Sequence, residues 1–520
     1  MIRKKKEYQP LFYALFAILG LWLGKYLYQD QLLPRFNFSN TSTGKLYDVL
    51  RTIDEFYVDT VSSSEVEENA IRSVLEQLDP HSYYLTREQI KYEDEQLQGN
   101  FSGIGIEFRI INDTLTVMHP ISNGPSDKFG IKAGDQIIAV NGINFTGDGI
   151  NSEKTMSSLR GEIGTEVELL LLQNGVKTIK TITRREIPLP SVDTYELLHK
   201  GTGYIKISRF GSKTAQEFKA AIKKLENREL LSKLIIDVRD NPGGLMHSVI
   251  EIAELFLSKN QKIVYTKGQN ESENYSASED GPYAKLPLIL LINENSASAS
   301  EILAGCMQDN DRATVVGRRS FGKGLVQRSF YLNDGSSFRL TIARYYTPVG
   351  RCIQKDYSNG KEQYNAESQN RLENGELSYR DSIQVTDSLK FKTPGGKVVY
   401  GGGGIIPDVF IPIDTGLTSL KYTAEQYDLL NEYLVKNFYF WREKFKALTL
   451  EESAQILSHN LEHQLLSYFK VKGQSLAAAS LPQSGFTRIK SKLLQDSFGK
   501  KGLYFLILQE DPMIKRALKN

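Results

Sequence analysis

The spacing of apolar residues changes along the chain and divides it into regions of different structure. Between residues 40 and 97 apolar side chains recur every three or four positions, which predicts short helices. From 98 to 186 the period falls to two and glycines interrupt the runs, which predicts a small β-rich domain. We therefore expect these two stretches to fold as distinct regions.

The remainder of the chain alternates strands and helices and then becomes helical. Residues 187–416 contain the continuously apolar strands 234–238 and 288–292 among helical stretches, which predicts an α/β core. Residues 356–397 are polar with scattered glycines, which predicts a surface excursion from that core. From 417 to 520 the pattern is again helical, and we expect a C-terminal helical region.

The N-terminus has the order of a membrane-targeting segment. Arg3 to Lys6 are basic, and the uncharged run 8–24 would span roughly 26 Å as a helix. The small-x-small pattern of a cleavage site does not follow the run, so within residues 1–28 we favour an uncleaved anchor over a removed signal. In either case the remainder of the chain is expected to leave the cytoplasm.

Length and composition exclude several classes of protein. The 520 residues are 40% apolar and 24% charged, which is typical of a globular chain with about three domains. The 64 basic and 62 acidic residues give a formal net charge of only +2. Because such a chain has no strong field for a polyanion, nucleic acid is not expected as its main partner.

Neither a disulfide framework nor a metal site is evident. Cys306 and Cys352 are the two cysteines, and their pairing cannot be assigned from sequence. No Cys-x-x-Cys pair offers a zinc site, and no phosphate-binding loop is present. These residues therefore give no indication of a zinc site or a nucleotide site.

Small hydroxyl residues stand where the apolar strand 288–292 runs into a helix. Ser298 followed by Glu301 matches a capping box, which needs no catalysis to explain it. Alternatively, a serine at such a turn is exposed as a nucleophile, with backbone N–H groups and the helix dipole beside it to stabilise an oxyanion. Both interpretations can hold for different serines.

A serine nucleophile needs a base, and Lys323 lies between two glycines. A solvated lysine would be protonated, so this role requires Lys323 to be buried against apolar surface beside the serine. On a strand beginning at Lys323, Gln327 would share its face and could orient the amine. The alternative is an ordinary solvated lysine in a glycine turn.

The segment 234–245 ends in a glycine turn that could supply half of an oxyanion hole. Its alternative is a tight connection between a strand and a helix. His247 follows closely, so a Ser-His-Asp arrangement with Asp237 or Asp240 is a competing hypothesis. Near the start of the β-rich domain, the glycine loop within 101–108 could receive a peptide carboxylate, or could be a β-bulge.

Seven motifs in this order resemble those of the carboxyl-terminal processing peptidases, the S41 serine proteases with a PDZ domain. The resemblance covers roughly residues 78–412 and rests on Leu-Asp-Pro-His-Ser-Tyr-Tyr-Leu (78–85), Gly-Ile-Gly-Ile (103–106), Gly-Ile-Lys-Ala-Gly-Asp (130–135), Asp-Asn-Pro-Gly-Gly (240–244), Ser-Ala-Ser-Ala-Ser-Glu (296–301), Phe-Gly-Lys-Gly-Leu-Val-Gln (321–327) and Gly-Gly-Gly-Ile-Ile-Pro-Asp (402–408). Each motif alone is weak, but the ordered set is specific.

The resemblance implies a role for each site residue. Ser298 would be the nucleophile, Lys323 the general base and Gln327 the residue that orients the lysine. The interval of 25 residues between Ser298 and Lys323 matches the family and selects Ser298 over Ser296 and Ser300. His247 would then have no catalytic role.

The resemblance also implies the backbone groups that bind substrate. N–H groups near Gly243, Gly244 and Ala299 would form the oxyanion hole. The loop of Gly103, Ile104, Gly105 and Ile106 would receive the C-terminal carboxylate of the substrate.

For the fold, the resemblance implies a ClpP- and crotonase-like protease core at 187–416 with an inserted PDZ domain at 98–186 and helical N- and C-terminal regions. Together with the N-terminal anchor, it implies an envelope endopeptidase held at the inner membrane, with its catalytic part in the periplasm and loose apolar protein C-termini as substrates. It implies that no metal and no cofactor are required, and a lipoprotein adaptor and a homo-oligomer are compatible with it. The alternatives are an inert PDZ-containing binding protein or chaperone, and a Ser-His-Asp hydrolase using His247.

Overall fold

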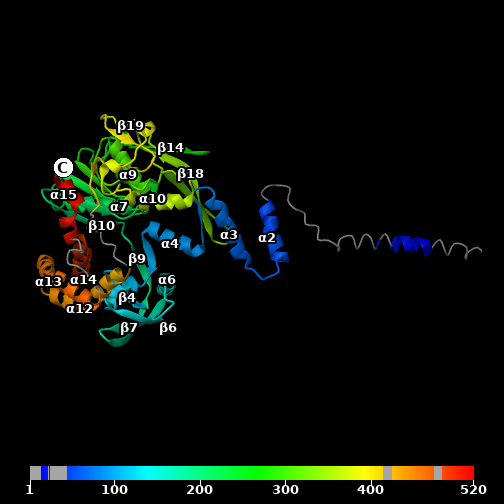
Figure 1. The fold of residues 1–520 in the computed structure, drawn as a ribbon, viewed down its shortest axis with the longest axis horizontal. Helices are drawn as coiled ribbons and strands as arrows, with labels where there is room; N and C mark the ends of the chain where they lie inside the picture. Colours follow the sequence, from blue (N-terminus) through cyan, green and yellow to red (C-terminus); the bar gives the residue numbers. More distant parts are fainter. Residues whose placement is uncertain (1–12, 21–22, 24–43, 414–423, 474–482, 520) are drawn as a thin grey trace, which may run out of the picture. The chain divides into compact units, whose positions relative to one another are not determined.

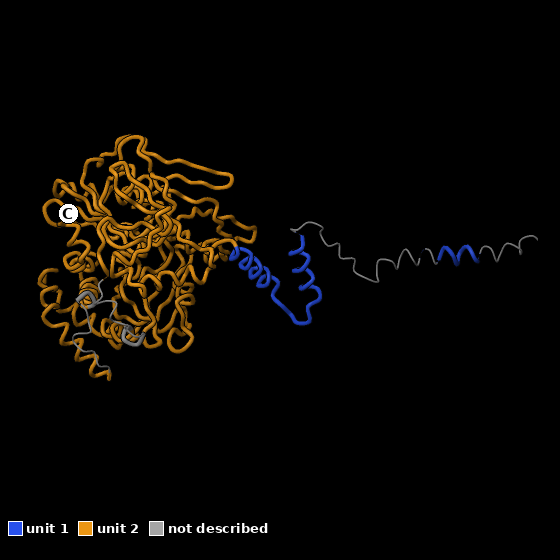
Figure 2. Tube along the Cα trace, turned by 45° about the horizontal axis from the view of Figure 1, so that its top comes forward, with its two compact units in different colours: residues 1–77 blue, residues 78–520 orange. Residues whose placement is uncertain are grey.

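A computed structural model describes residues 13–20, 23, 44–413, 424–473 and 483–519, and the chain forms two compact units, 1–77 and 78–520 (Figure 2). The first unit contains α2 (Gly44–Phe56) and α3 (Ser63–Glu76). Most of the predicted anchor lies outside the described residues, although 13–20 are helical. Within the described ranges, no helix is both long and apolar enough to cross a membrane.

The β-rich domain is a five-stranded antiparallel sheet with a short sixth strand. Its order is β3 (Ile106–Ile111), β4 (Thr114–Pro120), β5 (Gln136–Val140), β7 (Glu166–Gln173) and β8 (Val176–Thr183), with β6 (Ile143–Asn144) beside β5. Helices α5 (Pro125–Lys128) and α6 (Ser152–Leu159) belong to the same domain. Alternate residues such as Leu169 and Leu171 fill its core, as the period of two predicts. The strands that lead into and out of the domain, β2 (Asn100–Gly103) and β9 (Arg185–Pro188), pair with each other in an antiparallel ribbon.

The α/β core that the sequence predicts is built on a six-stranded sheet. Its order is β10 (Val192–Leu197), β11 (Thr202–Ile207), β12 (Lys233–Asp237), β15 (Leu288–Ile292), β16 (Thr314–Gly317) and β21 (Val409–Phe410). Every pair from β11 to β21 is parallel. Helices α7 (Thr214–Glu226), α8 (Met246–Glu254) and α9 (Ala299–Asp309) supply residues to the core on one face.

Both faces of this sheet are covered, which explains why its central strands are apolar throughout. On β15, Leu288, Leu290 and Ile292 belong to the cluster of α7, α8 and α9. Ile289 and Leu291 belong to a second cluster on the opposite face, which includes residues of the C-terminal helix α15 (Pro512–Lys519). A parallel sheet that is buried on both faces has no polar side in its sequence.

A second, antiparallel sheet includes a strand from the segment that precedes the β-rich domain. It has the order β1 (Tyr83–Leu85), β18 (Ser337–Tyr346), β13 (Lys262–Gly268) and β14 (Ser272–Ser276), and β17 (Leu325–Tyr331) also pairs with β18. The chain passes from β1 through α4 (Arg87–Gln98) into the β-rich domain and returns at β10. The β-rich domain is therefore inserted between two parts of the core.

Most residues of the polar segment 356–397 are exposed, as expected for a surface excursion, but the segment carries secondary structure and a few buried side chains. It forms α10 (Lys361–Glu373), two short 3-10 turns (Arg380–Ser382 and Asp387–Leu389) and β19 (Lys390–Lys392), which pairs with β20 (Val398–Tyr400) directly after the segment. Arg371 is buried because its guanidinium donates to the carbonyls of Ser320 and Phe321 and pairs with Glu367. The polar composition of the segment does not indicate that Arg371 is buried, because a charged side chain can be buried when it has ion-pair and hydrogen-bond partners.

The expected C-terminal helical region is present, drawn orange to red in Figure 1. It contains α12 (Ala424–Phe445), α13 (Leu450–Val471), α14 (Gln483–Glu510) and α15. Its own core, around Trp441 and Leu457, also includes Met118 and Ala133 of the β-rich domain. These helices therefore pack against the β-rich domain at one end and against the α/β sheet at the other.

Candidate active site

Ser298 lies at the turn between β15 and α9. Its backbone has φ 54° and ψ −115°, a conformation that residues with a side chain rarely adopt. The Glu301 carboxylate accepts the Ser298 N–H at 2.9 Å, which is the glutamate half of the predicted capping box. The cap and an exposed nucleophile are thus compatible in one turn.

Burial distinguishes Ser298 from the two neighbouring serines. Ser296 Oγ donates to the Val238 carbonyl at 2.8 Å, and Ser300 Oγ donates to the Asn241 carbonyl at 2.9 Å. Both of these serines are fully buried, whereas the Ser298 side chain is partly exposed. The structure therefore leaves Ser298 as the accessible hydroxyl of this segment.

Lys323 has the partly desolvated environment that a neutral amine requires. Burial, helped by the charge of Arg339, lowers the pKa of Lys323 to about 8. Its Nζ donates to Gln327 Oε1 at 2.8 Å, which is the predicted contact. The predicted strand beginning at Lys323 is not present, because β17 begins at Leu325 and its pairing with β18 is irregular between Val326 and Gln327. Between the described side chains of Ser298 and Lys323 no hydrogen bond is present in this structure.

A buried carboxylate, for which the sequence suggested only a capping role, joins the two predicted catalytic segments. Glu301 Oε2 accepts the N–H groups of Ser298 (2.9 Å) and Lys323 (2.8 Å). Its Oε1 accepts Gly322 N–H at 2.7 Å and Ser320 Oγ at 2.6 Å. Burial raises the pKa of Glu301 to about 7, although these hydrogen bonds lower it.

Tyr345 adds a second link that the sequence did not indicate. Its hydroxyl lies 2.6 Å from the Lys323 carbonyl and 3.1 Å from the Ser298 carbonyl. The side chain is 1% exposed, so this link is made in the interior. Two buried groups, Glu301 and Tyr345, therefore hold the serine turn against the lysine loop.

The predicted oxyanion donors differ in their availability. Gly243 N–H donates to Asn241 Oδ1 at 2.8 Å and is engaged. Gly244 N–H and Ala299 N–H have no hydrogen-bond partner among the residues that the structure describes. An added Cβ on Gly243 would lie 2.7 Å from Ser298 Cβ, so the glycine turn and the serine are in close approach.

The geometry of the competing Ser-His-Asp arrangement is not present. His247 is exposed, and within the described chain no hydrogen bond joins it to Asp237 or Asp240. Although burial raises the pKa of Asp237, the charges of Arg239 and Lys206 hold it well below its usual range. Asp237 is bonded to Arg239 and Tyr204, and Asp240 accepts from the side-chain amides of Asn293 and Asn295, so both candidate acids are engaged by other residues.

The glycine loop of the β-rich domain borders a small cavity of about 190 Å³. Its lining includes Gly103, Ile104, Gly105 and Ile106, the predicted carboxylate-binding residues. Arg160 also lines the cavity, and its guanidinium lies 2.6 Å from Glu95 Oε2 and 4.9 Å from the centre of the Phe101 ring. Sequence reasoning missed Arg160, because no local motif marks it.

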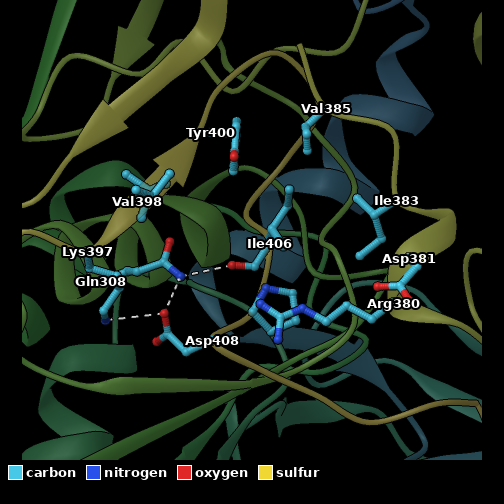
Figure 3. A pocket seen from close by; sticks show the side chains of 12 residues that line it. Gln308, Arg380, Asp381, Ile383, Val385, Lys397, Val398, Tyr400, Ile406 and Asp408 are labelled. Atoms are coloured by element: carbon cyan, nitrogen blue, oxygen red, sulfur yellow. Dashed lines mark hydrogen bonds and ion pairs between the residues drawn. The ribbon is translucent and has the colours of Figure 1, made fainter. Parts of the chain in front are cut away.

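The cavity of about 510 Å³ shown in Figure 3 contains none of the predicted site residues. Gln308 Nε2 donates to the Ile406 carbonyl and to Asp408, and Lys397 pairs with Asp408. Its central polar groups thus bond to one another. Elsewhere, Cys306 and Cys352 are free thiols, and no described cluster of His, Cys, Asp or Glu could hold a metal ion.

The inserted β-rich domain and the α/β core with its serine turn define a class of PDZ-containing serine peptidases, and comparison with known proteins agrees. The model of peptidase family S41 matches residues 201–360, and a PDZ domain model matches residues 102–182. The carboxy-terminal-processing protease of Bartonella bacilliformis is 35% identical over 350 residues, covering 66% of this chain and 80% of the relative. The carboxy-terminal processing protease CtpB of Bacillus subtilis is 35% identical over 316 residues, covering 60% and 65%.

The chain therefore belongs to the carboxy-terminal processing proteases of peptidase family S41, which are serine peptidases. Among solved structures, the photosystem II D1 C-terminal processing protease matches with a TM-score of 0.37 and 24% identity, covering 71% of this chain and 92% of that one.

Proposed function

We propose that this protease hydrolyses peptide bonds with a Ser298–Lys323 dyad. Neutral Lys323 takes the proton of Ser298 as Oγ attacks the scissile carbonyl, and the protonated amine then gives that proton to the leaving nitrogen. The resulting acyl-enzyme is cleaved by water, with Lys323 again acting as base. The observation that carries the proposal is the partly exposed Ser298 held beside a lysine of lowered pKa.

In this mechanism the backbone stabilises the tetrahedral intermediate. Gly244 N–H and Ala299 N–H are the donors we assign to the oxyanion, because both lack other partners among the described residues. Gly243 then serves by its small size rather than as a donor, since its N–H is bonded to Asn241. Substrate binding has to bring Ser298 Oγ and Lys323 Nζ into hydrogen-bond contact, as catalytic contacts often tighten only with substrate bound.

We assign substrate selection to the PDZ domain, with the loop of residues 103–106 binding the terminal carboxylate of a loose apolar C-terminus. The glycine loop and the adjoining cavity support this assignment. The alternation of strands and helices in the core, with both faces of its sheet covered, supports the likeness to ClpP and crotonase.

The dyad is tested by mass spectrometry of a disordered substrate with an apolar C-terminus, incubated with the full chain. Discrete fragments are expected for the wild type and for His247→Ala, and none for Ser298→Ala or Lys323→Ala. Cleavage that survives Lys323→Ala would reject the dyad. An intact substrate with every variant would favour a binding protein without peptidase activity.

We also propose that an uncleaved N-terminal anchor holds the catalytic part on the periplasmic side of the inner membrane. The basic residues 3–6 before the uncharged run 8–24 support this arrangement. Membrane fractionation with N-terminal sequencing tests it. A soluble protein whose first residue follows residue 28 would contradict it.

A further inference from the structure

The turn at residues 79–82 lies outside the predicted catalytic segments, yet it is firmly held. Asp79 Oδ1 accepts the His81 N–H at 2.8 Å, and Asp79 Oδ2 accepts Ser82 Oγ at 2.6 Å. Ser82 Oγ in turn accepts the Thr341 N–H of β18 at 3.2 Å. One carboxylate thus fixes the backbone of the turn, and the sheet fixes its position.

The turn makes direct contact with the residue that orients the lysine. The His81 carbonyl accepts a hydrogen bond from Gln327 Nε2, although the two residues are 246 positions apart in the chain. A backbone carbonyl can only accept, so the amide of Gln327 must present its NH2 group to His81. Gln327 Oε1 must therefore face the other way, where it accepts from Lys323 Nζ at 2.8 Å.

This amide orientation determines what the lysine can do. A neutral amine has two N–H donors and one lone pair, and the lone pair is what a general base uses. The Gln327 oxygen takes one N–H of Lys323 and leaves the lone pair free for Ser298. With the amide reversed, the Gln327 NH2 group would donate to that lone pair and block the base.

The side chain of His81 is anchored without adding a charge beside Lys323. Its Nε2 lies 2.6 Å from the hydroxyl of Tyr364, which comes from α10 and is 3% exposed. Burial and the nearby Lys323 lower the pKa of His81 to about 4, so the ring is neutral at ordinary pH. The ring therefore ties the turn to α10 while its backbone carbonyl contacts Gln327.

We propose that Asp79 and His81 are positioning residues of this protease, whose turn orients the Gln327 amide and through it the Lys323 amine. Asp79 acts by fixing the backbone of the turn, and His81 acts through its carbonyl. The proposal rests on the proposed function, because it assigns to Lys323 the role of base.

A double-mutant cycle in the full chain tests this pathway, with kcat and KM measured on the disordered substrate. Asp79→Ala is expected to lower kcat about 10-fold, with little change in KM, because the base is misplaced while the binding surface is intact. In a Gln327→Ala background, the same Asp79 substitution is expected to have almost no further effect, because the group through which it acts is gone.

Two further variants separate positioning from folding. Asp79→Asn keeps one acceptor for the His81 N–H, so it is expected to recover most of the lost kcat. Glu279→Ala, which removes an exposed carboxylate of the protease core outside the site and outside the PDZ domain, is the matched control and should leave both constants unchanged. If Asp79→Ala does not unfold cooperatively on heating, the cycle is carried out with Asp79→Asn instead. The loss in kcat should then be smaller, and it should likewise vanish in the Gln327→Ala background.

The outcomes distinguish the inference from the function on which it rests. Losses that multiply in the double variant, or a loss confined to KM, would overturn the positioning role. Lys323→Ala, included in the same series, is expected to be inactive. If it remained active, the dyad itself would be rejected, whatever the Asp79 variants did.

Discussion

At the scale of single residues, the most consequential group is the Glu301 carboxylate. Its two oxygens accept hydrogen bonds from four donors, which belong to the serine turn and to the lysine loop. A group buried in this way is costly to ionise, and only its full set of donors compensates. The stability of the fold and the positions of the serine turn and the lysine loop therefore both depend on Glu301.

Replacing Glu301 by glutamine tests this dependence, because the shape is kept while one oxygen becomes an NH2 group. That NH2 group must face two donors, so we expect a loss of about 1–3 kcal/mol in the free energy of unfolding. Denaturant unfolding and kcat should decline together. The exposed Glu279→Gln serves as the control, and equal stability of the two variants would contradict this dependence.

The lowered pKa of Lys323 gives a pH dependence with a definite sign. Since the base must be neutral, kcat/KM should fall as the pH drops below about 8 and Lys323 becomes protonated. Removing the neighbouring positive charge in Arg339→Gln should raise the Lys323 pKa. The acidic limb of the pH profile, where kcat/KM falls, should then move to higher pH. Arg328→Gln removes an exposed arginine on the same sheet and should leave the limb in place. A limb that Arg339→Gln does not move would argue against Lys323 as the titrating base.

At the scale of elements, the site depends on two turns in close approach. The glycine turn that follows β12 and the serine turn that follows β15 meet at the carboxyl ends of neighbouring parallel strands. Gly243 has φ +105°, and an added Cβ would lie 2.7 Å from Ser298 Cβ and 2.9 Å from the Ala299 nitrogen. The glycine therefore provides both the space for this close approach and a positive φ that other residues rarely adopt.

Gly243→Ala should therefore displace the serine turn and abolish detectable cleavage. Gly396→Ala is the matched control, because Gly396 also has a positive φ of +84° but has nothing within 4 Å of an added Cβ. The control should lose only about 1–2 kcal/mol in the free energy of unfolding, which is the cost of a positive φ for alanine, and it should keep its activity. Cleavage by Gly243→Ala at the wild-type rate would refute the close approach.

At the scale of the whole molecule, the C-terminal helices complete the protease core and also contact the PDZ domain. Ile514 and Ala517 of α15 are fully buried in the cluster that includes Ile289 and Leu291 of the sheet. Towards the other end, Arg442 of α12 pairs with Asp496 and donates to the Ala133 carbonyl of the PDZ domain. The C-terminal region is therefore integral to the fold.

Truncation of one buried side chain in α15 measures this contribution. Ile514→Ala is expected to lower the free energy of unfolding by about 2–5 kcal/mol, because it removes apolar contacts and leaves a cavity against the sheet. Lys515→Ala changes the exposed neighbour and should have little effect. Equal unfolding midpoints for the two variants would show that α15 does not seal the sheet.

By itself, the sequence determined the helical, β-rich and α/β regions and the segments that carry Ser298, Lys323 and Gln327. It could do so because periodicity and short motifs are local properties of the chain. Only the tertiary structure decided that Gly243 N–H is bonded to Asn241, that Arg371 is buried, and that the turn of Asp79 reaches Gln327. These contacts join residues through hydrogen-bond geometry and burial, which depend on how distant segments pack and leave no regular spacing in the sequence.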